Sequence, residues 1–427
     1  MRGLTASRKH CSNRRLAIQG IGRRLAAQLC GPYLPLPVLL LLAAGAIALR
    51  FDPSPHLTPD DLGYFSYLPA LFGGHPFSLD TLLYPNESPL THNTVNLWGV
   101  GTALGWLPFY SAARLLFPRA SLLGPEMWWA CGLGTVCYGL GGLTLLYLSL
   151  ARRFSYWCAG AAALASLVCT PLLYYLSPDP FFSHAFTFFL IAALVWLYTT
   201  RDLSRGRIWL AGGLLLGLGA DTRPQMVAFV LLPMLLRRPS LRQSALLAGG
   251  FLVAFLPQMI YWKATFGQWL VNPQASIYHG FFRAPAVWQV LFSPLHGLFW
   301  WHPLLLLAMG GLIWTLRERT LRRIGLACLA AFAVQVVINA SAIDWWAGSA
   351  FGARRFCDTL PLLAFGLCYA FSRIKPLILC GGLAGWWNIC LLLAVWPPEG
   401  QPRLLGGAEP LTLSVAKAVL ARAFFGI

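Results

Sequence analysis

The sequence predicts an all-α polytopic membrane protein, on the evidence of its composition, the spacing of its apolar runs and the placement of its charges. Of the 427 residues, 57% are hydrophobic and only 11% are charged, and the mean hydropathy is +0.62. A soluble domain carries about 25% charged residues, so most of this surface must lie in a medium other than water. Spanning segments are expected to be helices, because lipid offers no partner to a free backbone N–H or C=O.

The apolar runs predict about eleven spanning helices, because a helix needs roughly 20 residues to cross the bilayer core. We place them at about 33–50, 126–150, 156–176, 184–200, 208–220, 225–236, 244–262, 302–316, 324–341, 360–372 and 376–396. The chain then divides into a basic cytoplasmic tail (1–32), a transmembrane domain (33–396) with a first outer loop (51–125), and an outer C-terminal tail (397–427). In that tail, 410–425 is a candidate for a short interfacial helix.

Short clusters of Arg and Lys predict which turns face the cytoplasm. They occur at Arg14–Arg24, Arg152–Arg153, Arg201–Arg207, Arg237–Arg242, Arg317–Arg323 and Arg373–Lys375, separated by pairs of apolar segments. This scatter accounts for the net charge of +18 without a nucleic-acid partner. Of the fourteen acidic residues, only Asp202 and Glu318 then fall in cytoplasmic loops. Because acids do little to set topology, their concentration outside predicts a site on the outer face.

Residues 97–117 are apolar enough to span, but counting them as a span would place Arg152–Arg153 outside. The segment contains four glycines or prolines and carries Arg114 near its end. We therefore expect a juxtamembrane or re-entrant helix at the outer interface. The alternative is a true span, with the orientation of everything after it reversed.

The eleven cysteines lie mostly inside apolar runs, with no CxxC pair and no Cys/His spacing typical of a metal site. They are expected to behave as small hydrophobic residues, and neither a disulfide framework nor a cysteine metal centre is predicted.

The first outer loop contains an acidic doublet, Asp60 and Asp61, in the sequence TPDDLGYFSYLP. The Thr-Pro pair before it is typical of a helix start, where carboxylates are favoured by the macrodipole. One interpretation is that both acids only cap an interfacial helix. The other is that one of them is a general base or metal ligand, because desolvation beside the bilayer raises the pKa of a carboxyl toward the useful range. Tyr64 and Tyr67 would then form a wall for a sugar ring or a lipid tail.

Two further outer segments carry ionisable residues. Asp179 and His184, in SPDPFFSHAF, are either part of a capped helix start or contacts to a sugar, a metal or a phosphate. Arg223, in DTRPQ, is expected at the tip of a short hairpin, where an arginine is costly unless it is paired. Its candidate partners are the neighbouring Asp221 and a bound phosphate, whose geometry suits the guanidinium fork.

The aromatic outer loop 262–303 is typical of an interfacial belt, but it includes His296 in SPLHGLF. A glycine-flanked histidine at a helix entry can approach a ligand closely, so His296 is a candidate ligand contact.

The segment DWWAGSAFGARRFCD places Asp344 and Trp345 shortly before two adjacent arginines, Arg354 and Arg355. Two outer arginines run against the positive-inside trend. They either anchor the chain to lipid headgroups or bind a lipid-linked phosphate. In the second interpretation Trp345 or Trp346 stacks on a sugar, and Asp344 or Asp358 orients the arginines.

Several blocks together indicate a family. They are an outer Asp followed by GYFSYLPALF, then GTALGWLPFYSAARLLF, LSPDPFFSHAFTFFLIAALVWLY, LLLGLGADTRPQMVAFVLLP, LFSPLHGLFWWHPLLLL and DWWAGSAFGARRFCDTLPLL. In this order they cover most of the chain, and it resembles bacterial GT-C glycosyltransferases of the protein O-mannosyltransferase and lipid A aminoarabinose transferase type.

The resemblance implies a polyprenyl-phosphate-linked sugar as donor, an outer-loop Asp that deprotonates the acceptor, and an amphipathic helix where residues 97–117 lie. By motif position Asp60 is the better match for the base. Asp61 fills a place where relatives often have a small residue, and both acids remain candidates.

Residues and resemblance together predict a glycosyltransferase of the bacterial cytoplasmic membrane with its site on the outer side. The reaction would be an inverting single displacement with Asp60 or Asp61 as base, while Arg223, Arg354 or Arg355 neutralises the departing phosphate. The acceptor would be a glycan, a lipid or a protein, and a divalent cation (Mg²⁺ or Mn²⁺) is compatible with the site without being required. The alternative is a non-catalytic transporter or flippase of a lipid-linked glycan. The one-sided ionisable residues and the lack of a clear internal repeat disfavour it.

Overall fold

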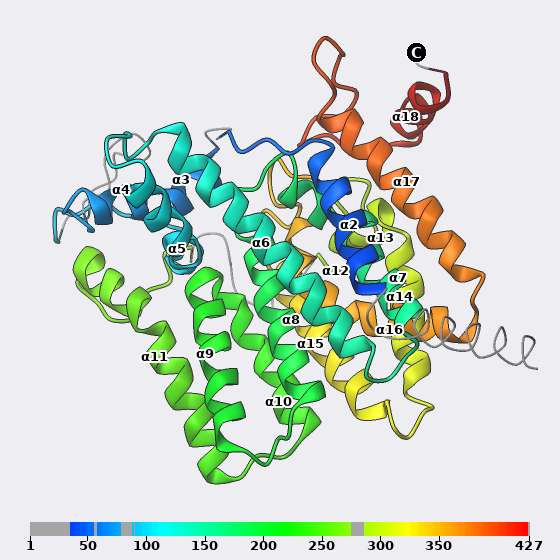
Figure 1. Ribbon diagram of the computed structural model, residues 1–427, viewed down its shortest axis with the longest axis horizontal. Helices are drawn as coiled ribbons and strands as arrows, with labels where there is room; N and C mark the ends of the chain where they lie inside the picture. The colour runs from blue at the N-terminus through cyan, green and yellow to red at the C-terminus, as the bar shows by residue number, and fades with distance from the viewer. Residues whose placement is uncertain (1–34, 55–57, 78–87, 89, 275–285, 426–427) are drawn as a thin grey trace, which may run out of the picture.

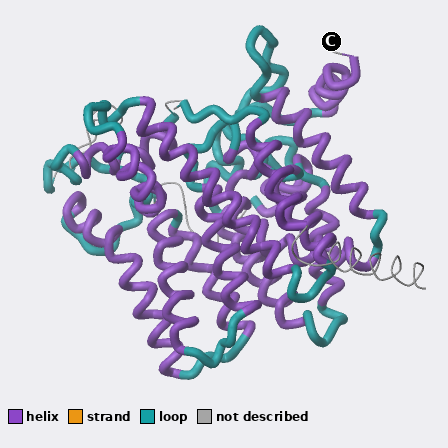
Figure 2. Tube along the Cα trace, in the orientation of Figure 1, coloured by secondary structure: helices purple, strands orange, loops and turns teal. Residues whose placement is uncertain are grey.

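The structure, a computed structural model, describes residues 35–54, 58–77, 88, 90–274 and 286–425, so the predicted tail 1–32 lies outside the described residues. The regular elements of the described residues are helices (Figures 1 and 2). In chain order they are α2 (Pro35–Ala48), α3 (Pro59–Phe65), α4 (Tyr67–Phe72), α5 (Gly101–Leu116), α6 (Pro125–Leu150), α7 (Tyr156–Val168), η1 (Pro171–Leu176), α8 (His184–Thr200), α9 (Gly206–Thr222), η2 (Pro224–Val230), α10 (Leu231–Leu236), α11 (Leu241–Phe266), α12 (Val287–Phe292), α13 (Leu298–Trp301), α14 (Leu304–Thr315), α15 (Arg322–Ala340), η3 (Arg354–Thr359), α16 (Leu360–Arg373), α17 (Leu377–Val395) and α18 (Leu413–Phe425).

Four described helices, α6, α11, α15 and α17, are long and apolar enough to cross a membrane by length and composition. Shorter apolar helices accompany them at α2, α7, α8, η2–α10 and α14. The chain is therefore an all-helical, polytopic membrane protein.

Most predicted spans coincide with observed helices, and the differences have local causes. The predicted span 156–176 stops being α-helical at Val168, because Pro171 cannot donate a backbone hydrogen bond. The span expected at 244–262 is longer in the structure. Ser240 starts it with a capping box, and Gly267 ends it in the left-handed conformation (φ +72°).

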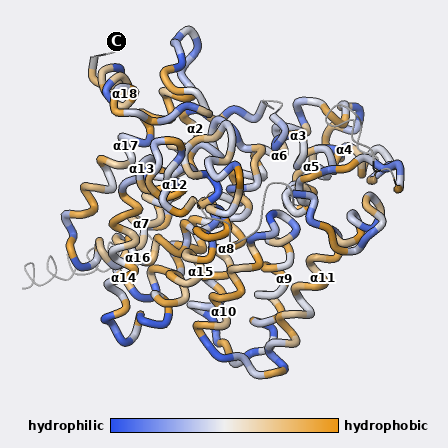
Figure 3. The backbone as a smooth tube through the Cα atoms, turned by 180° about the vertical axis from the view of Figure 1, so that it is seen from behind, coloured by the Kyte–Doolittle hydropathy of each residue, from blue (hydrophilic) through white to orange (hydrophobic). Residues whose placement is uncertain are grey.

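Three of the turns that carry basic clusters lie at one end of the bundle, which we call the basic end. The α8–α9, α10–α11 and α14–α15 turns lie at the bottom of Figure 1 and are hydrophilic in Figure 3. The opposite end carries α3, α4 and α5, and we call it the upper end.

Helix α5, which covers most of the ambiguous segment 97–117, has both of its ends at the upper end of the bundle. Its first residue, Gly101, lies against Thr222, where α9 arrives from the basic end. Its last residue is followed by the short loop into α6, which starts at the upper end. A helix that starts and finishes at one end does not cross the bundle, as expected for a juxtamembrane helix.

Helices α14 and α16 pack with their backbones in contact through a pair of glycines. A Cβ built on Gly311 would lie 2.0 Å from the carbonyl oxygen of Gly366, and one on Gly366 would lie 2.0 Å from that of Ala308. Small residues of this kind let helices approach closely in a membrane, where packing drives association. The preceding glycine, Gly310, has nothing within 4 Å of its Cβ position.

Gly311→Ala is expected to destabilise the protein by about 1–3 kcal/mol, because the methyl group forces α14 and α16 apart. Gly310→Ala is the matched control, and it should leave stability unchanged or slightly raise it, because Ala favours the helix by about 1 kcal/mol. Thermal unfolding in detergent compares the two, and equal midpoints would contradict the proposed packing.

Candidate active site

A polar pocket opens at the upper end of the bundle, with about 790 Å³ of empty space including its open mouth. Its walls come from α3, the segment before α5, the start of α8, the α9–η2 junction, α11 and η3. The lining residues are Asp60, Tyr64, Leu97, Trp98, Gly99, His184, Ala220, Arg223, Pro224, Gln225, Gln258, Trp262, Asn272, Pro273, Gln274, Arg354 and Arg355.

Helix geometry places the two side chains of the acidic doublet, Asp60 and Asp61, in different environments. Thr58 caps α3 in a capping box: its Oγ1 accepts from Asp61 N (3.4 Å), and its own N–H donates to Asp61 Oδ2 (3.3 Å). Asp61 is fully buried. Successive residues on a helix point about 100° apart, so Asp60 faces another direction and lines the pocket. The capping interpretation therefore holds for Asp61.

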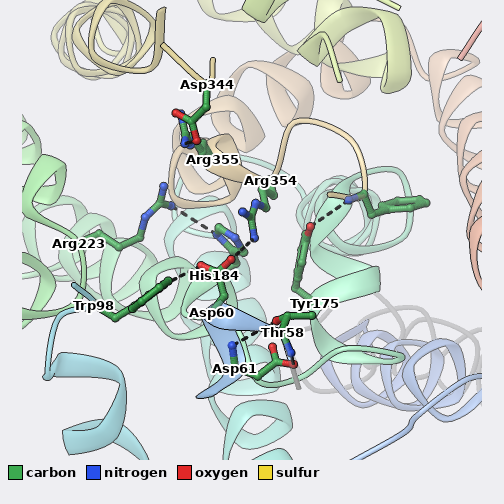
Figure 4. A network of polar contacts seen from close by, with 11 residues as sticks. Thr58, Asp60, Asp61, Trp98, Tyr175, His184, Arg223, Asp344, Arg354 and Arg355 are labelled. Atoms are coloured by element: carbon green, nitrogen blue, oxygen red, sulfur yellow. Dashed lines mark hydrogen bonds and ion pairs between the residues drawn. The ribbon is translucent and has the colours of Figure 1, made fainter. Parts of the chain in front are cut away.

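Asp60 is bound through both of its oxygens by donors from distant segments (Figure 4). Trp98 Nε1–H donates to Oδ1 at 2.9 Å, and Arg354 Nη1 lies 3.2 Å from Oδ2 in an ion pair. The Asp60 side chain is 27% exposed and that of Arg354 12%. The carboxylate is thus fixed in place while still open to the pocket.

Arg354 remains charged despite its burial. Desolvation alone would lower its pKa, but the negative charge of Asp60 outweighs burial and raises the pKa overall. Its guanidinium carbon also lies 4.8 Å from the ring centroid of Phe182, a cation–π contact.

The other two pocket arginines are also paired with carboxylates. Arg355 Nη2 lies 2.7 Å from Asp344 Oδ2, and Arg223 Nη1 lies 3.5 Å from Asp358 Oδ2. Burial raises the pKa of Asp358 to about 6, although the Arg223 charge acts in the opposite direction. The pocket therefore holds three guanidinium groups, each with an acidic partner from another part of the chain.

The suggestion that Asp221 pairs with Arg223 is wrong. Arg223 ends α9 in an extended conformation (φ −151°, ψ 116°), which turns its side chain away from the helix and toward η3. There it meets Asp358, and its Nη1 also lies 3.4 Å from His184 Nδ1. Both carboxylate oxygens of Asp221 are buried without a hydrogen-bond partner.

The remaining predicted residues lie at different places relative to this pocket. Tyr64 lines it, and burial together with the Asp60 charge raises the pKa of Tyr64 to about 12. Tyr67 instead points its hydroxyl at the carbonyl of Trp98, to which it donates at 2.5 Å. Asp179 is buried in the turn before α8, where burial and then the Asp61 charge raise its pKa well above the ordinary value.

His296 and Trp345 lie outside the pocket lining. His296 precedes α13 with a left-handed backbone (φ 62°), and its Nδ1 lies 2.7 Å from the carbonyl oxygen of Trp346. Burial lowers the pKa of His296. Trp345 meets Trp346 edge to face, with ring centroids 5.6 Å apart. Tyr278, His279 and Arg283, between α11 and α12, fall outside the described residues.

Several lining residues were not singled out in the sequence, chiefly Trp98, Gln258 and Trp262. Gln258 carried a usable signal, because it is a lone amide inside an apolar span. Its Oε1 accepts from Val100 N at 2.9 Å and so ties α11 to the start of α5. Trp98 offered no such signal, because the segments between the apolar runs contain many aromatic residues. Within the described residues, no group of three or more His, Cys, Asp or Glu side chains could hold a metal ion.

No protein-family model and no curated protein matches this sequence. Among solved structures, ArnT from Cupriavidus metallidurans, bound to undecaprenyl phosphate, is similar with a TM-score of 0.57 at 14% identity, over 91% of this chain and 69% of ArnT. The oligosaccharyltransferase AglB from Archaeoglobus fulgidus, in complex with an inhibitory peptide and a dolichol phosphate, gives a TM-score of 0.47 at 13% identity, over 92% of this chain and 54% of AglB. The likeness to ArnT confirms the expected resemblance to GT-C glycosyltransferases at the level of the fold.

Asp358→Ala is expected to destabilise the protein by about 3 kcal/mol, because it leaves the Arg223 guanidinium buried without its carboxylate. Asp202→Ala removes the carboxylate of an exposed pair with Arg205 and serves as the control, with no measurable change expected. The measurement is thermal or denaturant unfolding in detergent. If Asp358→Ala loses no more stability than Asp202→Ala does, the Arg223 guanidinium does not need the Asp358 carboxylate as its partner.

Proposed function

We propose that the protein is a membrane glycosyltransferase that moves a sugar from a polyprenyl-phosphate carrier to an acceptor outside the cytoplasmic membrane. The observation that carries the proposal is the pocket itself. A GT-C fold places one partly exposed carboxylate, Asp60, beside the guanidinium groups of Arg223, Arg354 and Arg355. The undecaprenyl phosphate bound to ArnT supports a polyprenyl-phosphate donor.

The reaction proposed is a single displacement that inverts the anomeric carbon. Asp60 removes the proton from an acceptor hydroxyl as its oxygen attacks the anomeric carbon from the face opposite the phosphate. The bond between that carbon and the phosphate oxygen breaks, and its electron pair leaves with the polyprenyl phosphate. The negative charge that develops there is stabilised by arginine, whose planar fork matches a phosphate.

Asp60 is the proposed base in preference to Asp61. A base must be able to reach the proton that it removes, and Asp60 lines the pocket whereas Asp61 is fully buried in the capping box of α3. Tyr64 and His184 line the same pocket and are proposed substrate contacts. Asp179, Tyr67, His296, Asp344 and Trp345 support or border the site, and a direct contact from any of them to a substrate remains a prediction.

Arg354 has two roles in this proposal. In the structure it neutralises Asp60 at 3.2 Å. When the donor phosphate enters, the guanidinium is shared with a second anion, which frees one carboxylate oxygen of Asp60 for the acceptor proton.

The proposed topology has eleven spans, a cytoplasmic N-terminus and an outer C-terminal tail, with the pocket facing the exterior. It is supported by the pocket's position at the end of the bundle opposite the basic turns, because basic turns favour the cytoplasm. The expected location is the cytoplasmic membrane of a bacterium, with a glycan, lipid or protein acceptor.

A reporter inserted in the α5–α6 loop, at residues 118–121, should report an outer location in this topology. A reporter in the α8–α9 turn is the opposite control and should report the cytoplasm. A cytoplasmic signal from the α5–α6 loop would overturn the sidedness of the site.

Asp60→Asn should lower transfer from radiolabelled polyprenyl-phosphate sugars by at least about 100-fold, the lower range for loss of a general base. Asp61→Asn is the matched control, because Asn still accepts the cap hydrogen bond through its side-chain oxygen, and transfer should stay within about threefold. Membranes containing each variant at equal abundance are supplied with donors that differ in the sugar. If the parent transfers a sugar and Asp60→Asn does so at the same rate, Asp60 is not the base.

A further inference from the structure

Hydrogen bonds of the Trp98 backbone and of the Asn96 side chain fasten the segment 96–98 to α3 and α4. Trp98 N–H donates to Asn96 Oδ1 at 2.9 Å, and Asn96 Nδ2–H in turn donates to the carbonyl of Gly63 at 2.7 Å. Tyr67 donates its hydroxyl proton to the Trp98 carbonyl at 2.5 Å. Asn96 is buried, so this short segment is fixed to the helix that carries Asp60.

The indole also lies flat against α3 at a position that only glycine permits. A Cβ built on Gly63 would lie 2.4 Å from Cδ2 of Trp98 and 2.5 Å from its Cε3. The absence of a side chain at Gly63 therefore lets the ring approach closely enough for Nε1–H to reach Asp60 Oδ1 at 2.9 Å.

The two groups that donate hydrogen bonds to Asp60 differ in their attraction for a phosphate. Arg354 lines the pocket and, in the proposed reaction, is shared with the donor phosphate. The indole N–H of Trp98 is uncharged and carries no comparable attraction for a phosphate. During the reaction, the hydrogen bond from Trp98 is then the contact that keeps Asp60 in place.

We propose that Trp98 is the positioning residue of the catalytic carboxylate, an inference that rests on the proposed function. It holds Asp60 Oδ1 so that Oδ2 points into the pocket once Arg354 turns to the phosphate. A hydrogen bond donated to a carboxylate also favours its charged form.

The other groups that interact electrostatically with Asp60 come from three directions. They are Tyr64 on α3, Asp179 in the turn before α8 and Arg354 on η3, with His184, Arg223 and Arg355 lining the same pocket. Replacing the Trp98 ring by a phenyl ring leaves the charges of all six groups unchanged. A change in the pH dependence of transfer therefore reports the indole hydrogen bond.

Trp98→Phe should lower kcat about tenfold, because a misplaced base is costly to the rate, and leave the KM for the donor within about twofold. The acid limb of the pH–rate profile should move to higher pH, because the carboxylate loses a hydrogen bond that favours its charged form. The assay measures transfer from a radiolabelled polyprenyl-phosphate sugar between pH 4 and pH 9.

Trp106→Phe is the matched control, because Trp106 is a buried tryptophan on α5 that does not line the pocket and whose indole N–H donates to Thr135 Oγ1 at 2.8 Å. Its pH profile should match that of the parent. Gly63→Ala is a second variant that keeps the indole and pushes it off α3, and it should shift the acid limb in the same direction as Trp98→Phe. Thermal unfolding of each variant in detergent confirms that it is folded.

The inference fails if Trp98→Phe lowers the rate equally at all pH values, or if Trp98→Phe and Trp106→Phe have the same pH profile. Infrared titration of the carboxyl groups, with the Asp60→Asn spectrum subtracted, follows Asp60 without any substrate. A parent that transfers no sugar from any donor refutes the proposed function. In that case an unshifted Asp60 band in Trp98→Phe would refute the positioning role separately.

Discussion

A guanidinium group buried at the edge of an apolar bundle needs an anionic partner, and this constraint arranges the upper end of the molecule. Leaving such a charge unpaired costs several kcal/mol, so each of the three arginines recruits a carboxylate. The pair between Arg354 and Asp60 joins residues 294 positions apart in the chain. It ties α3 to the segment before α16, and the pocket is the space that remains between them. The same requirement that closes the fold therefore brings a carboxylate and cations together.

Close backbone approach at glycines supplies the rest of the geometry. A Cβ on Gly99 would lie 2.0 Å from the carbonyl oxygen of Asp221, and one on Gly101 would lie 2.3 Å from Oγ1 of Thr222. The segment 96–100, just before α5, therefore lies between α3 and the end of α9. One side of this segment presents Trp98 to Asp60, and the other fixes the turn from which Arg223 extends toward η3.

The sequence predicted the parts of this structure that depend on local pattern. Hydropathy, capping and charge predict the span positions, the helix start at Thr58 and the placement of α5. All three signals come from residues that are close together in the sequence. The partners of the ion pairs in the pocket cannot be predicted in this way, because they are distant in the sequence. Asp221 is two residues from Arg223 and was a natural candidate partner, yet the extended backbone at Arg223 sends its side chain to Asp358 instead. Trp98 was missed for the same reason, because its role depends on a contact with α3 that no local pattern encodes.

The different roles of Asp60 and Asp61 follow from their successive positions in the first turn of α3. Capping needs the carboxylate at the third helical position to fold back on the helix start, which places Asp61 out of reach of any solute. The residue before it must then point elsewhere, and here it points at Arg354. In the resting protein that ion pair keeps the pocket close to neutral and the carboxylate occupied. In the proposed reaction, only a substrate that brings its own negative charge can compete for the arginine. The carboxylate would then become available as a base only after the phosphate-bearing donor has entered.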